Sequence, residues 1–406
     1  MQKKSFFAAL LITIVALSTA LIGEIKEAVY SDGKNDVKVS VDRTDVLIKH
    51  EGDEPSFPGL IEFSGKLVLP HHRSRPTEKE SNYRAVSAVS TDGGKSWKDL
   101  PSSSPFSDFE NSGLYGYMLD GSFVYMDTFP LEAKQRPAEW GPGGYHVTQR
   151  VKDPSFQLRH FSKNGELTET LHARLVDLPW QEASYELYGS ILQLENGDLL
   201  APFQCHIEAP KKDDKGRYIY AFSVFIARST DGGKTFKYQW TFDPMVHGKR
   251  IGEEGFVEPD IIVLRNGEIL CIMRTGSNTV MYQAWSKDLG KTWSQPVSTG
   301  WPGVKPKLRI LKNGVLVCSS GRGMYGHPQV TYAMFNIDGT GKNWEAPFEF
   351  YTGLSDNYTF NMERDGKLYI VYSVLSSTIP PYEFENKLPF ESIRWTVLNV
   401  TKTKSK

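Results

Sequence analysis

Two charged residues stand at the ends of apolar, strand-like segments, where an ionised side chain needs a partner. Glu258 opens one segment, and Arg274 closes the apolar run that begins at Ile269. An unpaired acid is costly in such a place, and a half-buried arginine usually has an anionic partner. We therefore interpret Glu258 as a candidate functional acid and Arg274 as a candidate anion-binding residue. The alternative is that the two residues form a purely structural ion pair with each other.

Two adjacent histidines occur in the basic segment 70–80. An ordinary imidazole titrates near neutral pH, so either His71 or His72 is a candidate proton donor. Neighbouring residues of a strand face opposite sides, so only one of the two can point toward a shared centre. A structural hydrogen-bonding role is the alternative. The histidines of the sequence lack the spacing of metal ligands, and we expect neither a metal site nor a cofactor.

Internal repeats indicate the elements that position these residues. The motif Ser-x-Asp-x-Gly-Lys-x-aromatic occurs at 90–97, 229–236 and 286–293, and a degenerate copy occurs at 336–344. In a hairpin turn of this kind the Asp side chain accepts backbone N–H groups, Gly adopts a positive φ, and the aromatic ring packs beneath. We therefore expect the repeated aspartates to hold turns and to take no part in chemistry.

A second repeat places a turn glycine between two apolar runs, and it occurs six times. The six glycines are Gly65, Gly121, Gly197, Gly267, Gly314 and Gly366. Asn-Gly and Asp-Gly in this setting are strong hairpin signals. Each unit then holds two hairpins, or about four strands, and radial packing of such sheets gives a propeller. The sequence predicts an all-β fold, a six-bladed β-propeller of four-stranded antiparallel sheets, as a single domain over residues 21–406.

The composition and the first residues indicate where the protein acts. The 406 residues carry a net charge of −1, with 39% hydrophobic and 23% charged residues. These values argue against a disordered chain, a multi-span membrane protein and a nucleic-acid partner, which needs a basic surface. Residues 1–20 have the layout of a secretory signal peptide. We expect a secreted or periplasmic protein without stable membrane insertion after cleavage; an uncleaved anchor is the alternative. The oligomeric state stays open.

The repeats resemble those of the sialidase (neuraminidase) superfamily, whose Asp-box (BNR) repeats build a six-bladed β-propeller. Sialidases share a glutamate, a short hairpin and then an arginine, and Glu258, the Gly267 turn and Arg274 match this order. The resemblance implies that Glu258 is the base for a tyrosine nucleophile and that Arg274 binds the substrate carboxylate. Tyr358, which precedes the last Asp-Gly hairpin, matches the nucleophile, with a core or rim aromatic as the alternative. A neutral phenol avoids the repulsion between a carboxylate nucleophile and an acidic sugar.

The sequence departs from the sialidase pattern at the residues that bind the carboxylate. Ser56 stands in place of the first of the family's three arginines, and Ser373 in place of the glutamate that orients it. Both partners of one ion pair are missing together, which indicates a reshaped pocket. No arginine occurs at 328–331, where the third is expected, and Arg322 is the candidate substitute.

The family's acid, an aspartate in the loop after the first hairpin, has no match by residue type. Glu80 lies nearest by its offset from Arg75, and His71 is the other candidate acid. Arg75 and His72 are further candidates for binding the substrate.

The resemblance implies a secreted, sialidase-like glycoside hydrolase that acts on an acidic or related terminal sugar, with a glycan as its partner. The same residue types suit a polysaccharide lyase on uronic-acid glycans, in which a Tyr or His base removes the proton beside the carboxylate. A glycan-binding propeller without catalytic activity is the third hypothesis.

Overall fold

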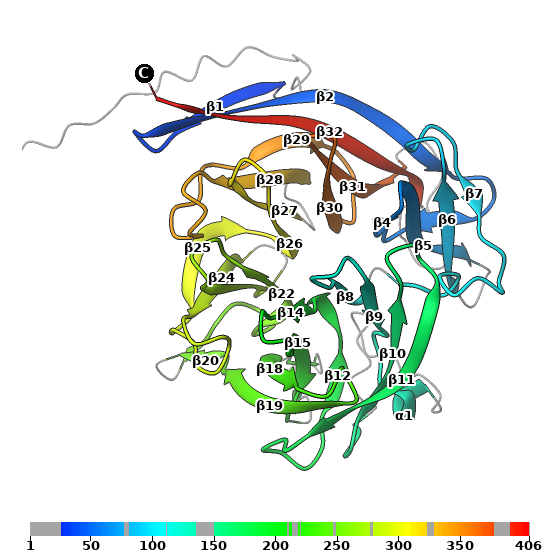
Figure 1. Cartoon of the computed structure of the whole chain (residues 1–406), viewed down its shortest axis with the longest axis vertical. Coiled ribbons are helices and arrows are strands. Elements are labelled where there is room, and N and C mark those ends of the chain that lie inside the picture. Colours follow the sequence, from blue (N-terminus) through cyan, green and yellow to red (C-terminus); the bar gives the residue numbers. More distant parts are fainter. Residues whose placement is uncertain are drawn as a thin grey trace, which may run out of the picture.

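The computed structural model describes residues 26–76, 81–110, 112–134, 150–208, 211–212, 218–219, 221–246, 249–276, 279–322, 329–376 and 390–405. Its antiparallel sheets are arranged as six blades around a common axis (Figure 1). The predicted six-bladed β-propeller is thereby confirmed. Within the described ranges, the helix α1 (Leu131–Lys134) is a single turn, and no helix is long and apolar enough to cross a membrane.

The first three blades follow one another along the chain. Blade 1 contains β3 (Glu54–Ser56), β4 (Ile61–Phe63), β5 (Lys66–Pro76), β6 (Ser81–Ser90) and β7 (Lys98–Asp99). Blade 2 contains β8 (Gly113–Tyr117), β9 (Phe123–Met126), β10 (Ser155–Phe161) and β11 (Leu167–Val176). Blade 3 contains β12 (Ser184–Glu186), β14 (Leu192–Gln193), β15 (Leu199–His206), β18 (Ser223–Ser229) and β19 (Thr235–Phe242). Between them, β13 (Tyr188–Ser190) pairs in parallel with β8.

The last three blades complete the ring. Blade 4 contains β22 (Val257–Val263), β23 (Ile269–Arg274), β24 (Val280–Ser286) and β25 (Val297–Pro302). Blade 5 contains β26 (Val304–Ile310), β27 (Leu316–Arg322), β28 (Val330–Asn336) and β29 (Phe348–Thr352). Blade 6 contains β30 (Thr359–Arg364), β31 (Lys367–Leu375), β32 (Phe390–Lys404), β2 (Asn35–Lys49) and β1 (Glu27–Ser31). Two small hairpins, β16 (Lys211–Lys212) with β17 (Tyr218–Ile219) and β20 (Met245–Val246) with β21 (Lys249–Arg250), lie outside the blades.

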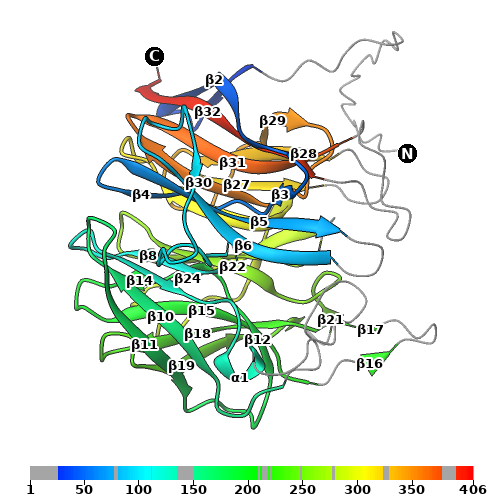
Figure 2. The same ribbon diagram turned by 90° about the vertical axis from the view of Figure 1, so that its right-hand side faces the viewer.

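Blade 6 is closed by strands from both ends of the described chain. The strand β2 pairs with β32 from Asn35 opposite Lys404 to Lys49 opposite Ser392. The two strands lie side by side in both ribbon views (Figures 1 and 2). Val37 and Val39 of β2 are fully buried in the hydrophobic cluster between blades 5 and 6. The ring is therefore held closed by backbone hydrogen bonds between residues far apart in sequence.

Blades 2 and 3 differ from the separate four-stranded sheets that the repeats predict. Their outermost strands, β11 and β19, pair in parallel, with Arg174 opposite Thr235. This pairing joins the two blades into one continuous sheet. Because each outer strand is otherwise an open edge, the pairing satisfies backbone groups that would remain exposed.

The repeated aspartates hold turns, as the sequence predicts. Asp92 Oδ1 accepts the backbone N–H groups of Lys95 and Ser96, each at 3.0 Å, and the Ser96 hydroxyl donates to Oδ2 at 2.6 Å. These hydrogen bonds, led by the one from the Ser96 side chain, hold the pKa of Asp92 well below its ordinary value. In the degenerate fourth copy, Asn336 Oδ1 accepts the N–H of Gly341 at 2.8 Å, where the other copies use a serine hydroxyl.

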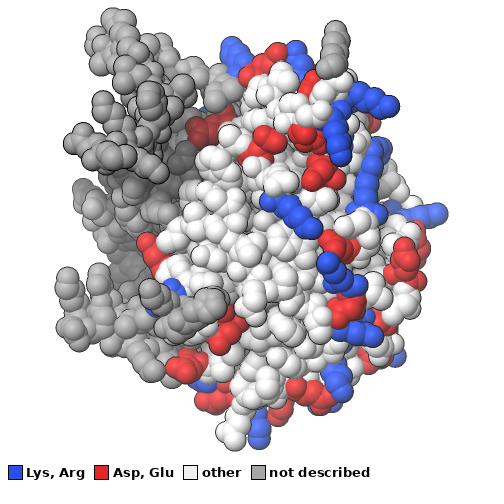
Figure 3. Space-filling view, turned by 90° about the vertical axis from the view of Figure 1, so that its left-hand side faces the viewer, with Lys and Arg blue, Asp and Glu red and all other residues white. Residues whose placement is uncertain are grey.

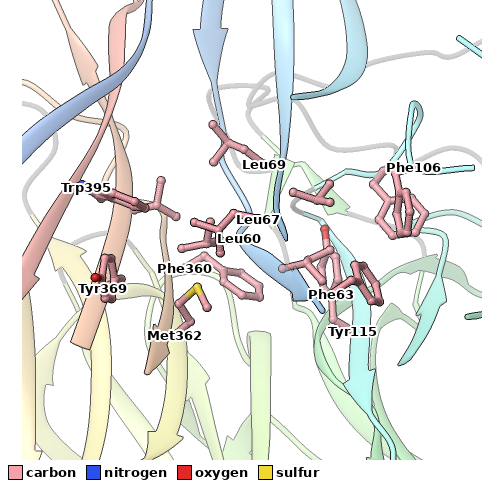
Figure 4. Close-up of a cluster of buried hydrophobic side chains, with 14 of the residues drawn as sticks. Leu60, Phe63, Leu67, Leu69, Phe106, Tyr115, Phe360, Met362, Tyr369 and Trp395 are labelled. Carbon is pink, nitrogen blue, oxygen red and sulfur yellow. The ribbon is translucent and has the colours of Figure 1, made fainter. Parts of the chain in front are cut away.

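The hydrophobic core lies between successive blades. Figure 4 shows one cluster, in which Leu60 and Leu67 lie between Trp395 of blade 6 and Phe63 of blade 1. Phe63 also packs edge-on against Phe123 of blade 2, with ring centroids 5.3 Å apart. On the outer face seen in Figure 3, charged side chains of both signs are interspersed.

Candidate active site

In four blades, a residue with left-handed backbone geometry lies within the inner strand or next to its end. Phe57 (φ 48°), Glu258 (φ 47°), Lys305 (φ 41°) and Asn357 (φ 65°) occupy these positions. None is glycine, so each conformation is unfavourable by roughly 1–2 kcal/mol. Backbone strain of this kind persists only where the surroundings enforce it, and it is concentrated at functional sites.

Glu258 is the centre of a hydrogen-bonded cluster that joins four blades. Its backbone N–H donates to Gln204 Oε1 at 2.7 Å. Its Oε2 accepts the backbone N–H of Lys305 at 2.7 Å, and its Oε1 lies 2.8 Å from Arg274 Nη1. The same Oε1 accepts a hydrogen bond from the hydroxyl of Tyr358. Glu258 is 4% exposed, so this carboxylate acts in a dry environment.

Tyr358 is held by contacts around its ring and its backbone. The ring centroid lies 5.3 Å from that of Phe57, and its hydroxyl lies 3.4 Å from Arg274 Nη1. Its backbone N–H donates to Asp356 Oδ1 at 3.1 Å. The structure thus brings together Glu258, Arg274 and Tyr358, the residues that the sequence singles out from blades 4 and 6.

Arg274 lies between two carboxylates of the protein. Nη1 contacts Glu258 at 2.8 Å, and Nη2 contacts Glu254 at 3.0 Å. The ion pair with Glu258 that we considered as the structural alternative is therefore present. Both ends of the guanidinium bind protein carboxylates, which leaves less of it for a substrate anion.

His71 does not fit the role of acid. It is fully buried, its Nδ1 lies 3.0 Å from the carbonyl oxygen of Leu69, and Arg73 donates to its Nε2 at 3.3 Å. Burial lowers the pKa of His71 to about 3. The imidazole is therefore neutral at neutral pH, and its one ring N–H is far too weak an acid to protonate a leaving group.

His72 faces the opposite side of β5, toward the site. Its ring lies edge-on to Phe57 with a centroid separation of 5.5 Å, and Phe57 in turn packs on Tyr358. Burial lowers the pKa of His72 as well. His72 is paired across the sheet with Ser56, the residue that stands where sialidases have an arginine.

The structure does not describe the side chains of three other predicted residues. Glu80 lies outside the described residues. Arg75 and Arg322 are located near the ends of β5 and β27, opposite Asn82 and Val330, but their side chains are not among those described.

The two serines that replace a sialidase ion pair meet at the junction of blades 1 and 6. Ser56 and Ser373 are both fully buried, and Ser373 Oγ accepts the backbone N–H of Phe57 at 3.0 Å. Phe57 also contacts Phe390, with ring centroids 5.8 Å apart. An aromatic cluster therefore occupies the part of the site where the family's pattern has charged residues.

Sequence reasoning missed two ionisable residues of the site, Lys305 and Asp356. Burial lowers the pKa of Lys305 to about 7 and raises the pKa of Asp356 to about 7. A signal for the first was present, because Lys305, Lys307 and Arg309 alternate along one short segment and so share a face of a strand. The signal for Asp356 was its position two residues before Tyr358.

Among the residues described, no cluster of three or more His, Cys, Asp or Glu could hold a metal ion.

The shifted pKa of Asp356 predicts a pH-dependent gain in stability for D356N. The folded state binds more protons than the unfolded state between about pH 4 and 7, so this carboxyl's contribution to stability falls as pH rises through that window. An amide mimics the protonated carboxyl and does not titrate. The free energy of unfolding of D356N, relative to that of wild type, should therefore increase by about 2 kcal/mol from pH 5 to pH 8. Free energies of unfolding at both pH values measure this gain. The exposed Asp365, changed to Asn, is the control, and an equal gain in both variants would refute the assignment.

The fold and its Asp turns define a β-propeller of the Asp-box type. The family model for the BNR repeat-like domain matches residues 147–373, more than half of the chain. The chain belongs to this family. No curated protein matches it.

Solved structures share the fold at low sequence identity. A protein of unknown function from Dyadobacter fermentans is 17% identical, covers 89% of this chain and 99% of its own, and superposes with a TM-score of 0.63. The Hadza microbial sialidase Hz136 is 14% identical over 85% of this chain and 65% of its own, with a TM-score of 0.52. Trypanosoma rangeli sialidase in complex with 2,3-difluorosialic acid, described as a covalent intermediate, is 13% identical over 88% of this chain and 59% of its own, with a TM-score of 0.53. The chain thus spans less than two thirds of either sialidase.

Proposed function

We propose that this protein is a sialidase-like glycoside hydrolase that removes an acidic or related terminal sugar from a glycan. One observation carries the proposal: the Tyr358 hydroxyl donates to Glu258 Oε1, the oxygen that also lies 2.8 Å from Arg274 Nη1. A phenol that donates to a buried carboxylate is the arrangement of an activated oxygen nucleophile and its base. Export directed by residues 1–20 is part of the proposal.

The proposed reaction has two steps. Glu258 takes the phenol proton while the Tyr358 oxygen attacks the anomeric carbon, and the bond to the leaving group breaks. The leaving oxygen takes a proton from an acid, for which Glu80 is the candidate. In the second step, the deprotonated acid takes a proton from water while the water oxygen attacks the same carbon, and Glu258 returns its proton to the departing Tyr358 oxygen as the sugar is released.

A screen of the purified protein tests the proposal. Natural glycans that end in sialic, uronic or neutral deoxy sugars are the substrates, and chromatography detects a released monosaccharide. A product with a new double bond, seen by its ultraviolet absorbance, would identify a lyase instead. Binding of a glycan without any release would identify a binding protein.

A fluorinated sugar gives a direct test of the nucleophile. A 2,3-difluoro sugar of the class that is turned over should form a lasting bond to Tyr358. The fluorine beside the anomeric carbon slows both steps, but the anomeric fluoride is a good leaving group and keeps only the first step fast. Mass spectrometry of the digested protein locates the label. A label on another residue would contradict the proposed mechanism.

A further inference from the structure

We infer that Lys305 is the second cation of this site and that it binds the carboxylate of the sugar beside Arg274. The inference rests on the proposed function and names a residue that takes the place of the missing arginines. It specifies the ligand as a sugar with one carboxylate.

The position of Lys305 is fixed by its backbone and by two aromatic rings. Its left-handed φ of 41° and the 2.7 Å hydrogen bond from its N–H to Glu258 place it at the start of β26. Its Nζ lies 5.5 Å from the ring centroid of Tyr358 and 5.9 Å from that of Tyr188. Lys305 is 6% exposed, so its charge is screened little by water. The ammonium group is therefore held next to the proposed nucleophile.

The charges around Arg274 require another cation once a carboxylate enters. Arg274 already forms ion pairs with two carboxylates, those of Glu258 and Glu254. A substrate carboxylate would add a third negative charge around one guanidinium, which is unfavourable in a dry site. Lys307, the next inward-facing lysine of β26, pairs with Asp260 at 3.3 Å. Lys305 is the cation that lies against the Tyr358 ring itself.

The charge of Lys305 depends on the groups that face it. Burial lowers its pKa to about 7, while Glu258, Asp356 and Asp260 favour the charged form and Lys307 opposes it. His72 lies on the blade 1 side of the same region, and its pKa is itself lowered in part by the charge of Lys305. Arg274 and Glu254 complete the charged groups of the neighbouring blade 4.

A bound carboxylate must favour the protonated form of Lys305. Above pH 7 the free site holds a largely neutral lysine, so binding of an acidic sugar is accompanied by uptake of a proton from water. Affinity for the acidic sugar should therefore fall as pH rises from 7 to 9. A neutral sugar should show neither effect.

The test compares K305M and K305R with the wild type. Methionine keeps the length and the apolar contacts with the two rings, and arginine keeps the charge. The probes are free glucuronate, free N-acetylneuraminate and, as the neutral control, glucose, each titrated by calorimetry at pH 8 in two buffers of different ionisation enthalpy. We expect the wild type to bind at least one acidic sugar more tightly than glucose, with proton uptake. K305M should bind that sugar at least about tenfold more weakly and without proton uptake, since a hydrogen bond to a charged group is lost.

The outcomes separate this inference from the proposed function. The affinity of K305R for the acidic sugar should lie within a few-fold of the wild-type affinity. Wild type, K305M and K305R should all bind glucose with the same affinity. Y358F should still bind the acidic sugar with proton uptake, so the contact can be measured in a protein without turnover. If the protein cleaves no glycan but still binds an acidic sugar in a way that depends on Lys305, the proposed hydrolase function is wrong and the inference about Lys305 stands.

Other results would overturn the inference. It is wrong if K305M binds the acidic sugar as tightly as wild type does, or if neither acidic sugar binds the wild type more tightly than glucose does. A loss of kcat in K305M with an unchanged KM would also refute it, because that result indicates a proton-transfer role. Thermal unfolding of each variant checks folding, and K305Q replaces K305M if that variant does not fold.

Discussion

Replacing Tyr358 by Phe should lower kcat/KM on the substrate found in the glycan screen by about a thousandfold or more. The change removes one oxygen atom, which is the proposed nucleophile, and it keeps the ring between Phe57 and Lys305. Glu258 also loses one hydrogen-bond donor but keeps Arg274 Nη1 at 2.8 Å and the backbone N–H of Lys305 at 2.7 Å. The variant should therefore fold and bind its glycan while turnover is lost.

The control for this variant is Y117F. The hydroxyl of Tyr117 also makes hydrogen bonds, to the backbone of Glu62 in the neighbouring blade, at 2.8 and 3.0 Å. Its removal should leave kcat/KM within a few-fold of wild type. Retention of full turnover in Y358F would rule out the tyrosine nucleophile and leave the propeller fold unaffected.

Replacing Gly94 by Ala should destabilise the protein by about 3 kcal/mol or more. Gly94 has a φ of 89°, and a Cβ atom there would lie 2.0 Å from Cη2 of Trp395. Trp395 is 1% exposed, and its Nε1 donates to Asp45 of β2 at 2.6 Å, so the indole cannot move without disturbing the closing strands. The turn of blade 1 is thus packed directly onto the closure of blade 6.

Gly93 gives a matched control for this prediction. Its φ is 76°, but a Cβ there would meet only the far end of Arg364, at 3.8 Å. G93A should therefore show only the backbone strain, about 1 kcal/mol. Urea unfolding of both variants measures the difference, which isolates the contact with Trp395. Equal losses in G93A and G94A would show that the indole adapts to the extra methyl group.

The repeats made the architecture predictable. Each Asp turn is a local structure: among the described residues, the hydrogen bonds of Asp92 go to residues within four positions of itself, so the motif determines its turn wherever it occurs. Six hairpins with alternating apolar strands then leave few arrangements other than a ring of sheets. The pairing of β11 with β19 and of β2 with β32 left no such signal, because a strand edge carries no sequence code for a distant partner.

The candidate site was predictable only in part. Glu258, Arg274 and Tyr358 were found because their order along the chain matches a known pattern. The sequence did not show that both ends of the Arg274 guanidinium bind protein carboxylates, because Glu254 becomes its second partner only through the fold. The two histidines were assigned to opposite faces by strand alternation, but that rule does not say which of them is enclosed in the core.

Six repeated units, their turns, and an acid, an arginine and a tyrosine that could act together can all be read from the order of the amino acids. Those properties are local, or they depend on the order of residues along the chain. The folded protein was needed to show that Lys305 and Asp356 join the site, that His72 and not His71 faces it, and that Arg274 lies between two carboxylates. These features depend on which residues of different blades come within a few ångströms, and ring closure determines that distance.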